Sequence, residues 1–251
     1  MNNRNHSQGV SQSVNVVWLL IVTIIFLSIN TIPALAEHLE MRWPDVALGG
    51  IFFIGLFLLG GFVHGPDRAR DRVLVFNWVL LFIYLIHQFE EHGVDLFGRV
   101  YFFHEYASQV LESKGLELTP AAIFRINTLT VWFSFLIAIW GGRHFTWPSL
   151  AAAGLVFTNG LFHIAIAVSR SEYNPGLVTA TVLFLPISIL YFRLIPAACG
   201  HGWKAIVASI LFGVASHALL STLIGASASA LALLAAMPLI ANFIWLRIFA
   251  R

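Results

Sequence analysis

Two histidines and two carboxylates stand at the end of an otherwise apolar segment of this chain. The string His87-Gln88-Phe89-Glu90-Glu91-His92 directly follows the hydrophobic run 73–86. Inserting an ionisable side chain that deep into a hydrophobic segment costs about 2.5–3.5 kcal/mol, so such residues indicate a functional site. On a helix, His87, Glu90 and Glu91 occupy positions i, i+3 and i+4 and share one face. This spacing is typical of a metal site or a proton relay.

The donor types favour a metal bound through nitrogen and oxygen. Imidazoles combined with carboxylates suit zinc, iron or manganese. The one cysteine, Cys199, excludes a disulfide within the chain and a cysteine-rich metal site. Glu90 and Glu91 point about 100° apart on a helix, so one can bind the metal while the other acts as a general base or hydrogen-bonding partner. We expect Glu91 to be the base if Glu90 is a ligand, and the reverse assignment stays open.

Further candidates come from other apolar segments. His163 follows Asn159 by one helical turn, and His217 stands among small residues in Gly213-Val214-Ala215-Ser216-His217. An isolated histidine in a membrane span is often only an interhelical hydrogen bond. We nevertheless predict that the metal ligands come from one set, which comprises His87, Glu90, Glu91, His163, His217 and Glu37. The residues predicted to bind substrate or support the ligands are Asn127, Asn159, His92, Tyr173 and Arg125.

The composition indicates that a lipid bilayer surrounds these residues. Of the 251 residues, 59% are hydrophobic and 10% are charged, whereas soluble domains carry about 25% charged residues. The net charge of +2 says little, because the charges lie in the connecting loops. No basic nucleic-acid patch, glycine-rich phosphate loop or Ser–His–Asp order stands out. We therefore predict an all-α integral membrane protein, a single polytopic domain over residues 1–251 with a polar tail at 1–13.

Apolar runs of about 20 residues predict eight membrane spans. They cover 14–35, 46–64, 73–92, 122–140, 148–169, 177–196, 204–224 and 228–248. The last boundary is the weakest, so seven spans is the alternative. The segment 93–121 is aromatic and amphipathic enough to lie in the membrane interface as a lid; the alternative is an ordinary loop within an aromatic belt. The first run, followed by Ala34-Leu35-Ala36, also imitates a signal peptide with a cleavage site after Ala36, but we treat it as a retained span.

The distribution of lysine and arginine predicts the orientation. With both termini inside, the inner side holds nine of these residues and the outer side five, which agrees with the excess expected of cytoplasmic loops. In this topology the candidate site residues of five different spans share the outer half of the membrane. Inverting the protein would move them together, so the convergence does not depend on the orientation. It predicts one site rather than several unrelated polar residues.

The string His87-x-x-Glu90-Glu91 in a small polytopic chain resembles the bacterial HXXEE domain family. The resemblance is centred on the third to sixth spans. Asn159, His163 and the stretch Tyr173-x-Pro175-Gly176-Leu177-x-Thr179-Ala180 belong to the same pattern. The resemblance implies that these residues form the site, and it implies a bacterial inner membrane. It adds no reaction, because the family has no established activity.

Three functions fit these residues. The first is a membrane metalloenzyme that hydrolyses an amide or ester with zinc-bound water, or oxidises a lipid-like substrate with non-haem iron. The second is a proton-coupled or metal-ion transporter, although no internal repeat is evident and the site lies to one side of the midplane. The third is a non-catalytic assembly subunit whose polar cluster holds helices together. The sequence favours the enzyme and leaves the metal, the substrate and the oligomeric state open.

Overall fold

The computed structural model describes residues 4–64, 69–100, 102–112, 118–141, 146–224, 227, 230–238 and 240. These residues are almost entirely helical, and the β-structure among them is a single isolated bridge between Val94 and Val100. The predicted all-α class is therefore confirmed for the described part of the chain.

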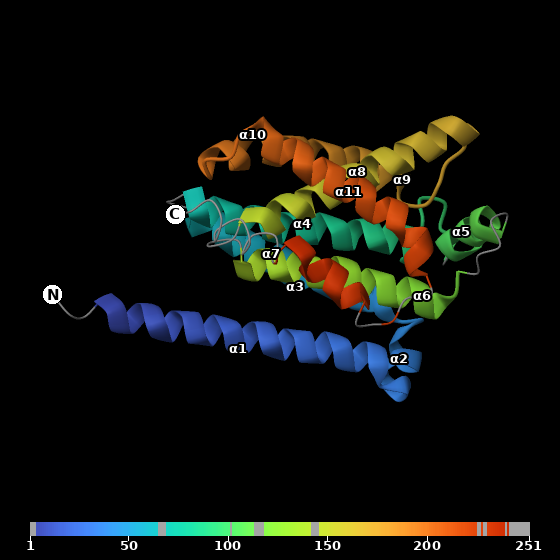
Figure 1. Cartoon of the computed structure of the whole chain (residues 1–251). Coiled ribbons are helices and arrows are strands. Elements are labelled where there is room, and N and C mark those ends of the chain that lie inside the picture. The colour runs from blue at the N-terminus through green and yellow to red at the C-terminus, as the bar shows by residue number, and fades with distance from the viewer. Residues whose placement is uncertain are drawn as a thin grey trace.

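The elements follow one another as a bundle of long helices interrupted by short π-helical segments (Figure 1). In chain order they are α1 (Arg4–Thr31), α2 (Pro33–Leu39), α3 (Trp43–His64), α4 (Ala69–Gln88), η1 (Phe89–Gly93), α5 (Phe102–Glu112), α6 (Pro120–Arg125), η2 (Ile126–Trp132), α7 (Phe133–Gly141), α8 (Thr146–Arg170), α9 (Leu177–Thr179), η3 (Ala180–Phe184), α10 (Leu185–Ala198) and α11 (Trp203–Leu223).

Five of the described helices are long and apolar enough to cross a membrane. They are Trp43–Gly60, Arg72–Gly93, Pro120–Gly141, Thr146–Arg170 and Leu177–Ala198, each close to a predicted span. The pair α1 and α2 would make a sixth span, but it is bent by 84°. Pro33 stands at the start of α2, where its ring cannot continue the preceding helix.

The sequence predicted eight spans, but fewer of the described helices are long and apolar enough to cross a membrane. The seventh predicted span corresponds to α11, whose apolar part is the shorter segment Trp203–Leu219. Most of the eighth, 228–248, lies outside the described residues. Within the part of the chain that the structure describes, the bundle therefore has five spans, or six if the bent pair is one.

Helix α8 lies at the centre of the bundle, because it contacts α4, α7, α10 and α11. Its contact with α11 is close: a Cβ on Gly154 would lie 2.0 Å from the carbonyl oxygen of Ser209, and one on Gly213 would lie 2.4 Å from the carbonyl oxygen of Gly154. Small residues allow such an approach between helix backbones. Gly213, one of the small residues near His217, thus allows α11 to lie close to α8.

Three of the crossing helices contain π-helical segments, η1, η2 and η3. Such segments are rare, occur as single wide turns inside α-helices and are frequent at functional sites. Each of the three begins within one residue of a polar side chain of the candidate site: Glu90 in η1, Asn127 in η2 and Thr179 just before η3. The widened turns therefore lie next to the polar residues of the candidate site.

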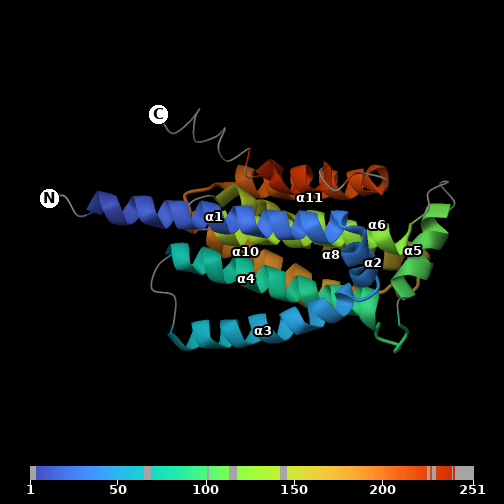
Figure 2. The same ribbon diagram turned by 90° about the horizontal axis from the view of Figure 1, so that it is seen from below.

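Helix α5 closes one end of the bundle and runs across the direction of the long helices (Figures 1 and 2). It is joined to η1 by the turn 94–100, in which the Asp95 carboxylate accepts hydrogen bonds from the backbone N–H groups of Phe97 and Arg99, both at 2.9 Å. Phe103 and Tyr106 of α5 face inward, and Phe103 packs edge-on against His92 at 4.6 Å between ring centroids. The helix therefore covers the end of the bundle at which the HQFEEH string lies.

Candidate metal centre

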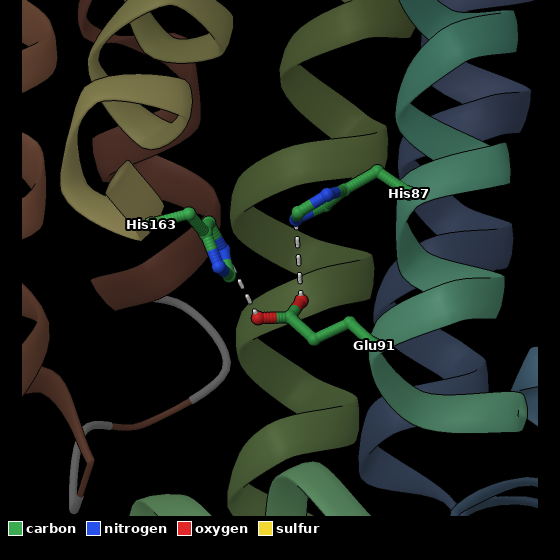
Figure 3. A group of neighbouring side chains, drawn as sticks. All are labelled: His87, Glu91 and His163. Carbon is green, nitrogen blue, oxygen red and sulfur yellow. Dashed lines mark ion pairs between the residues drawn. The ribbon is translucent and has the colours of Figure 1, made fainter. Parts of the chain in front are cut away.

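Three side chains converge in the interior of the bundle: His87 from the end of α4, Glu91 from η1 and His163 from α8. Figure 3 shows both imidazole rings pointing toward the Glu91 carboxylate. His87 Nε2 lies 3.6 Å from Glu91 Oε2, and His163 Nε2 lies 3.5 Å from Glu91 Oε1. All three side chains are buried, and one potential ligand atom from each lies within 4.8 Å of the others. Among the described residues, this is the group that can hold a metal ion.

Hydrogen bonds behind the two imidazoles fix which nitrogen carries the proton. His87 Nδ1 lies 2.9 Å from the Thr179 hydroxyl, which itself donates to the Gly176 carbonyl at 3.1 Å. The hydroxyl must therefore accept from His87 Nδ1–H. His163 Nδ1 lies 2.6 Å from Asn174 Oδ1, and Asn174 Nδ2 donates to the backbone carbonyl of His163, which fixes the amide orientation. In its neutral form, each ring therefore carries its proton on Nδ1 and leaves a lone pair on Nε2.

These lone pairs face a carboxylate, which is an unfavourable arrangement unless a cation lies between them. His87 Nε2 is buried and has no hydrogen-bond partner among the described residues. Ligands that surround zinc at about 2.0–2.2 Å with tetrahedral angles lie about 3.3–3.6 Å from one another, close to the two observed nitrogen–oxygen distances. An Nδ1–H group held by a protein oxygen is the usual support of a metal-binding histidine. The group therefore fits a divalent cation in both donor type and spacing.

A glycine in the loop after α8 packs directly on both rings. Gly176 has a φ of +88°, and a Cβ placed on it would lie 2.6 Å from His87 Cε1 and 2.9 Å from His163 Cε1. Neither the backbone conformation nor the space admits another residue without movement. The loop 171–176 therefore forms the wall of the centre, and its sequence Asn-Pro-Gly serves the site as well as the turn.

Residues 78–191 match the family model described as a protein of unknown function with HXXEE motif. This region, a little under half of the chain, is therefore similar to the HXXEE family. No curated protein and no solved structure matches the chain. The matched region contains the two histidines, the carboxylate and the supporting loop, so the resemblance seen in the sequence is confirmed, and the family brings no reaction with it.

The two glutamates of the HXXEE motif have different environments. Glu91 faces the histidines, whereas the Glu90 carboxylate accepts hydrogen bonds from Val178 N at 3.2 Å, Thr179 N at 2.8 Å and the Tyr173 hydroxyl at 3.0 Å. A carboxylate at a helix N-terminus satisfies free N–H groups and matches the helix dipole. Glu90 therefore anchors the start of the α9 span. The expected role of Glu90 as metal ligand or base stays a prediction, although its oxygens accept these three hydrogen bonds in the structure.

The first variable residue of the motif is also part of the structure. Gln88 is fully buried; its Nε2 donates to Asn127 Oδ1 at 2.6 Å and its Oε1 accepts from Trp132 Nε1. Asn127 Nδ2 in turn donates to the Ile123 carbonyl at 3.0 Å. Both ends of the Asn127 amide are thus occupied, which leaves it little capacity to bind a ligand. Sequence reasoning missed Gln88, although a glutamine inside an apolar run was a signal for it.

His92 stands beside Glu91 rather than among the ligands. Its Nε2 lies 3.1 Å from Glu91 Oε2, while its ring packs between Trp43 and Phe103 at 4.8 Å and 4.6 Å between centroids. The predicted supporting role therefore agrees with its position. The aromatic contacts hold the ring in place, and His92 is the one histidine that touches Glu91 and also lines the neighbouring cavity.

The cavity has a volume of about 310 Å³ and extends from Glu91 to α5 and α11. Asn159 and His217, two of the predicted residues, lie on its wall. His217 Nδ1 donates to the Gly213 carbonyl at 2.8 Å, and its ring packs on Phe162. His217 does not belong to the group of potential ligands with Glu91. The structure thus places it across the cavity from the centre instead of in the predicted ligand set.

The remaining predicted residues lie outside the centre. Glu37 is exposed on α2, because the bend at Pro33 carries it away from the direction of α1. Arg125 is exposed at the end of α6. Tyr173 contacts Glu90 and accepts from Leu96 N at 3.3 Å, so it links the loop before α9 to the turn after η1. Thr179 and Asn174 take the supporting roles, of which the family pattern indicated Thr179 alone.

Proposed function

We propose that this protein is an integral-membrane metalloenzyme in which His87 Nε2, His163 Nε2 and the Glu91 carboxylate hold one divalent metal ion. The observation that carries the proposal is the pair of buried imidazoles whose Nε2 atoms are directed at a buried carboxylate, while their Nδ1 atoms are held by protein oxygens. A purely structural cluster would instead direct N–H groups at that carboxylate.

Three protein ligands leave room for water or substrate on the metal. Catalytic zinc sites have three protein ligands and an open position, and bound water there has a pKa of about 7. Two histidines and one carboxylate are equally the ligand set of non-haem iron oxygenases. Both chemistries, hydrolysis and oxidation, fit the residues, with manganese as a further choice of metal. The single group of three donors among the described residues disfavours a two-iron site.

The protein's own residues supply the remaining functions of the site. Glu91 and His92 both line the apolar cavity, so a substrate held there contacts the open side of the centre. His92 Nε2 lies 3.1 Å from Glu91 Oε2 and donates its N–H to that carboxylate, so the lone pair that can accept a proton is on the unpartnered Nδ1. The proposed base is thus His92, because Glu91 serves as a ligand and Glu90 anchors α9.

The membrane is the medium of this chemistry. Several long apolar helices indicate a membrane protein, and the orientation with both termini inside a bacterial cytoplasmic membrane remains part of the proposal. A substrate that reaches a cavity with a mainly apolar surface within such a bundle is itself lipid-like or a small apolar molecule.

Metal content of the purified protein, measured by mass spectrometry, tests the proposal. We expect close to one metal ion per chain in the native protein and less than about a tenth of that in His87→Gln and His163→Gln, because each retained ligand pair binds much more weakly. His38→Gln, which changes an exposed histidine on α2, is the matched control and keeps its metal. The identity of the metal separates hydrolysis, with zinc, from oxidation, with iron.

Size-exclusion profiles and melting curves of each variant show that loss of metal is not loss of fold. A native protein without metal, even after incubation with zinc, iron and manganese salts, would overturn the proposal. Proton or ion flux in vesicles, abolished by the same two substitutions, would then identify the cluster as a transport site.

A further inference from the structure

The cavity beside the candidate metal centre is lined by both polar and apolar residues, and most of its surface is apolar. Its polar side chains are Glu91, His92, Asn127, Thr130, Asn159, Ser216, His217 and the hydroxyl-bearing Tyr84. Phe103 and Ala107 of α5, Leu118, and Ile123 and Ile126 at the α6–η2 junction form much of the remainder. The volume of about 310 Å³ is near the lower limit of small-molecule sites, which span about 300–1,000 Å³. The space therefore suits one slender ligand with a small head group.

Several polar atoms on this wall have unused hydrogen-bonding capacity. The Asn159 carbonyl oxygen and the Thr130 hydroxyl are buried without a partner among the described residues. His217 is fixed by the bond from its Nδ1 to the Gly213 carbonyl, which leaves the Nε2 lone pair as an acceptor. Since buried polar atoms are normally paired, these groups indicate a ligand that donates hydrogen bonds. Asn127 is not one of them, because both ends of its amide are engaged.

The charge of the wall restricts the head group. No lysine or arginine is among the described residues that line the cavity, and its one carboxylate, Glu91, already faces His87, His92 and His163. A carboxylate or phosphate buried here would have no counter-ion and would be repelled by Glu91. With the candidate metal centre occupied, an ammonium group would lose its hydration with no free carboxylate to replace it. The wall is therefore complementary to a neutral head group.

We propose that this cavity binds a neutral single-chain amphiphile whose head is an alcohol or a primary amide, held by Asn159 and His217 next to Glu91. The apolar chain packs on Phe103, Leu118 and Ile126. This inference names the substrate class of the proposed enzyme and rests on that function only for the ligand's role as substrate, since binding in the cavity does not require a metal.

A photoreactive dodecan-1-ol, with a diazirine near the end of its chain, tests the inference on the full-length protein in phospholipid nanodiscs. We expect ultraviolet labelling to map to the cavity wall and to be displaced by dodecan-1-ol and dodecanamide. Dodecanoate and dodecylammonium should displace it about tenfold less well. Labelling is measured in both chelator-treated and zinc-treated protein, so that failure of the metal centre is distinguished from failure of the cavity.

Two substitutions and a control complete the experiment. Asn159→Leu and His217→Phe each remove one acceptor and should weaken labelling about tenfold, because a buried donor loses its partner; His217→Phe keeps an aromatic ring against Phe162. Ser188→Ala removes a buried, unpartnered hydroxyl of α10 that is not part of the cavity wall and should label as the native protein does. Equal labelling of all three variants, labelling confined to lipid-facing residues, or stronger displacement by either charged analogue would overturn the inference.

Discussion

Two clusters of buried polar side chains lie in this bundle, and they differ in how their hydrogen bonds are completed. In the first, Asn77 Nδ2 donates to the Ala138 carbonyl at 2.8 Å, Ser149 Oγ donates to Asn77 Oδ1 at 2.5 Å, and Ser149 pairs with the Tyr191 hydroxyl at 2.6 Å. All three side chains are fully buried. In the second, the candidate metal centre, His87 Nε2 has no partner among the described residues and the Nε2 atoms of two histidines face Glu91.

The difference separates a structural network from a binding site. The amide and hydroxyl groups of the Asn77 network are paired with one another and join α4, α7, α8 and α10 without any further molecule. Such satisfied networks specify the packing of a helical bundle. The metal centre uses its outer nitrogens for Thr179 and Asn174 and keeps its inner ones free. Atoms left unpaired in a buried cluster indicate where a ligand is expected.

The largest effect is expected from Gly176→Ala. The new methyl group meets the rings of both His87 and His163, and the φ of +88° adds about 1–2 kcal/mol of strain for a residue other than glycine. Metal affinity should fall by roughly tenfold or more while the Asn77 network stays intact. Gly200→Ala is the matched control, since its φ is +75° but its Cβ would meet no atom within 4 Å. Metal titrations of both variants make the comparison, and equal loss in the two would show that strain alone, not contact with the rings, is responsible.

Substitution in the structural network should have the opposite pattern. Asn77→Leu leaves the Ser149 hydroxyl and the Ala138 carbonyl without their amide partner, which destabilises the fold by about 1–3 kcal/mol. Metal content per folded chain should not change. Thermal melting of the chelated protein measures the first effect and metal analysis the second, with Ser188→Ala as a control whose hydroxyl has no partner to lose. Loss of metal in Asn77→Leu would mean that metal binding depends on the Asn77 network, so that the two clusters are energetically coupled.

Glu90→Gln tests a link between anchoring and metal binding. An amide in place of the carboxylate removes the negative charge at the start of α9 and brings an NH₂ group toward the N–H groups of Val178 and Thr179. Stability should fall by about 1 kcal/mol. Because Thr179 also orients His87, metal affinity should fall several-fold. Glu172→Gln, at an exposed carboxylate, is the control; unchanged metal affinity in Glu90→Gln would restrict Glu90 to holding the loop.

The sequence predicted that the polar residues of different spans lie at one depth, but not which of these side chains contact one another. Helical rise fixes the depth of a residue, so counting along the spans was sufficient to bring His87, Glu91 and His163 together. Rotation about the helix axis depends on packing and on the widened turns of η1, η2 and η3, which no residue pattern indicates. For this reason Glu90 was assigned to the metal, and the pairing of Gln88 with Asn127 and Trp132 was not foreseen.

The position of Glu37 shows a second case in which depth along a predicted span was not sufficient to predict where a side chain lies. Counting along 14–35 placed it at the outer end of a straight span, close to the site. The 84° bend at Pro33 depends on how α2 packs, and this bend leaves Glu37 exposed. Helix bounds were therefore predictable to within a few residues, whereas the direction of the chain beyond a break was not.

The smallest effect is expected at Asp95, an acidic residue four positions after Glu91 whose hydrogen bonds are complete. Burial alone would raise the pKa of Asp95, but the bonds from Arg99 and Phe97 outweigh it and lower the pKa. The carboxylate therefore stabilises the turn 94–100 above its unfolded pKa, and this contribution is lost as the pH falls through the lowered value. Because Arg99 is 42% exposed, Asp95→Asn should cost about 1 kcal/mol or less.

Hydrogen exchange at the amides of Phe97 and Arg99 measures that change. Exchange should become faster in Asp95→Asn at neutral pH, and the native protein should approach the variant in acid. Metal content should not change, because every oxygen contact of Asp95 is within its own turn. If Asp95→Asn lost its metal, the turn 94–100 would be part of the metal centre. Complete hydrogen bonding would then no longer distinguish a structural carboxylate, such as Asp95, from a metal ligand, such as Glu91.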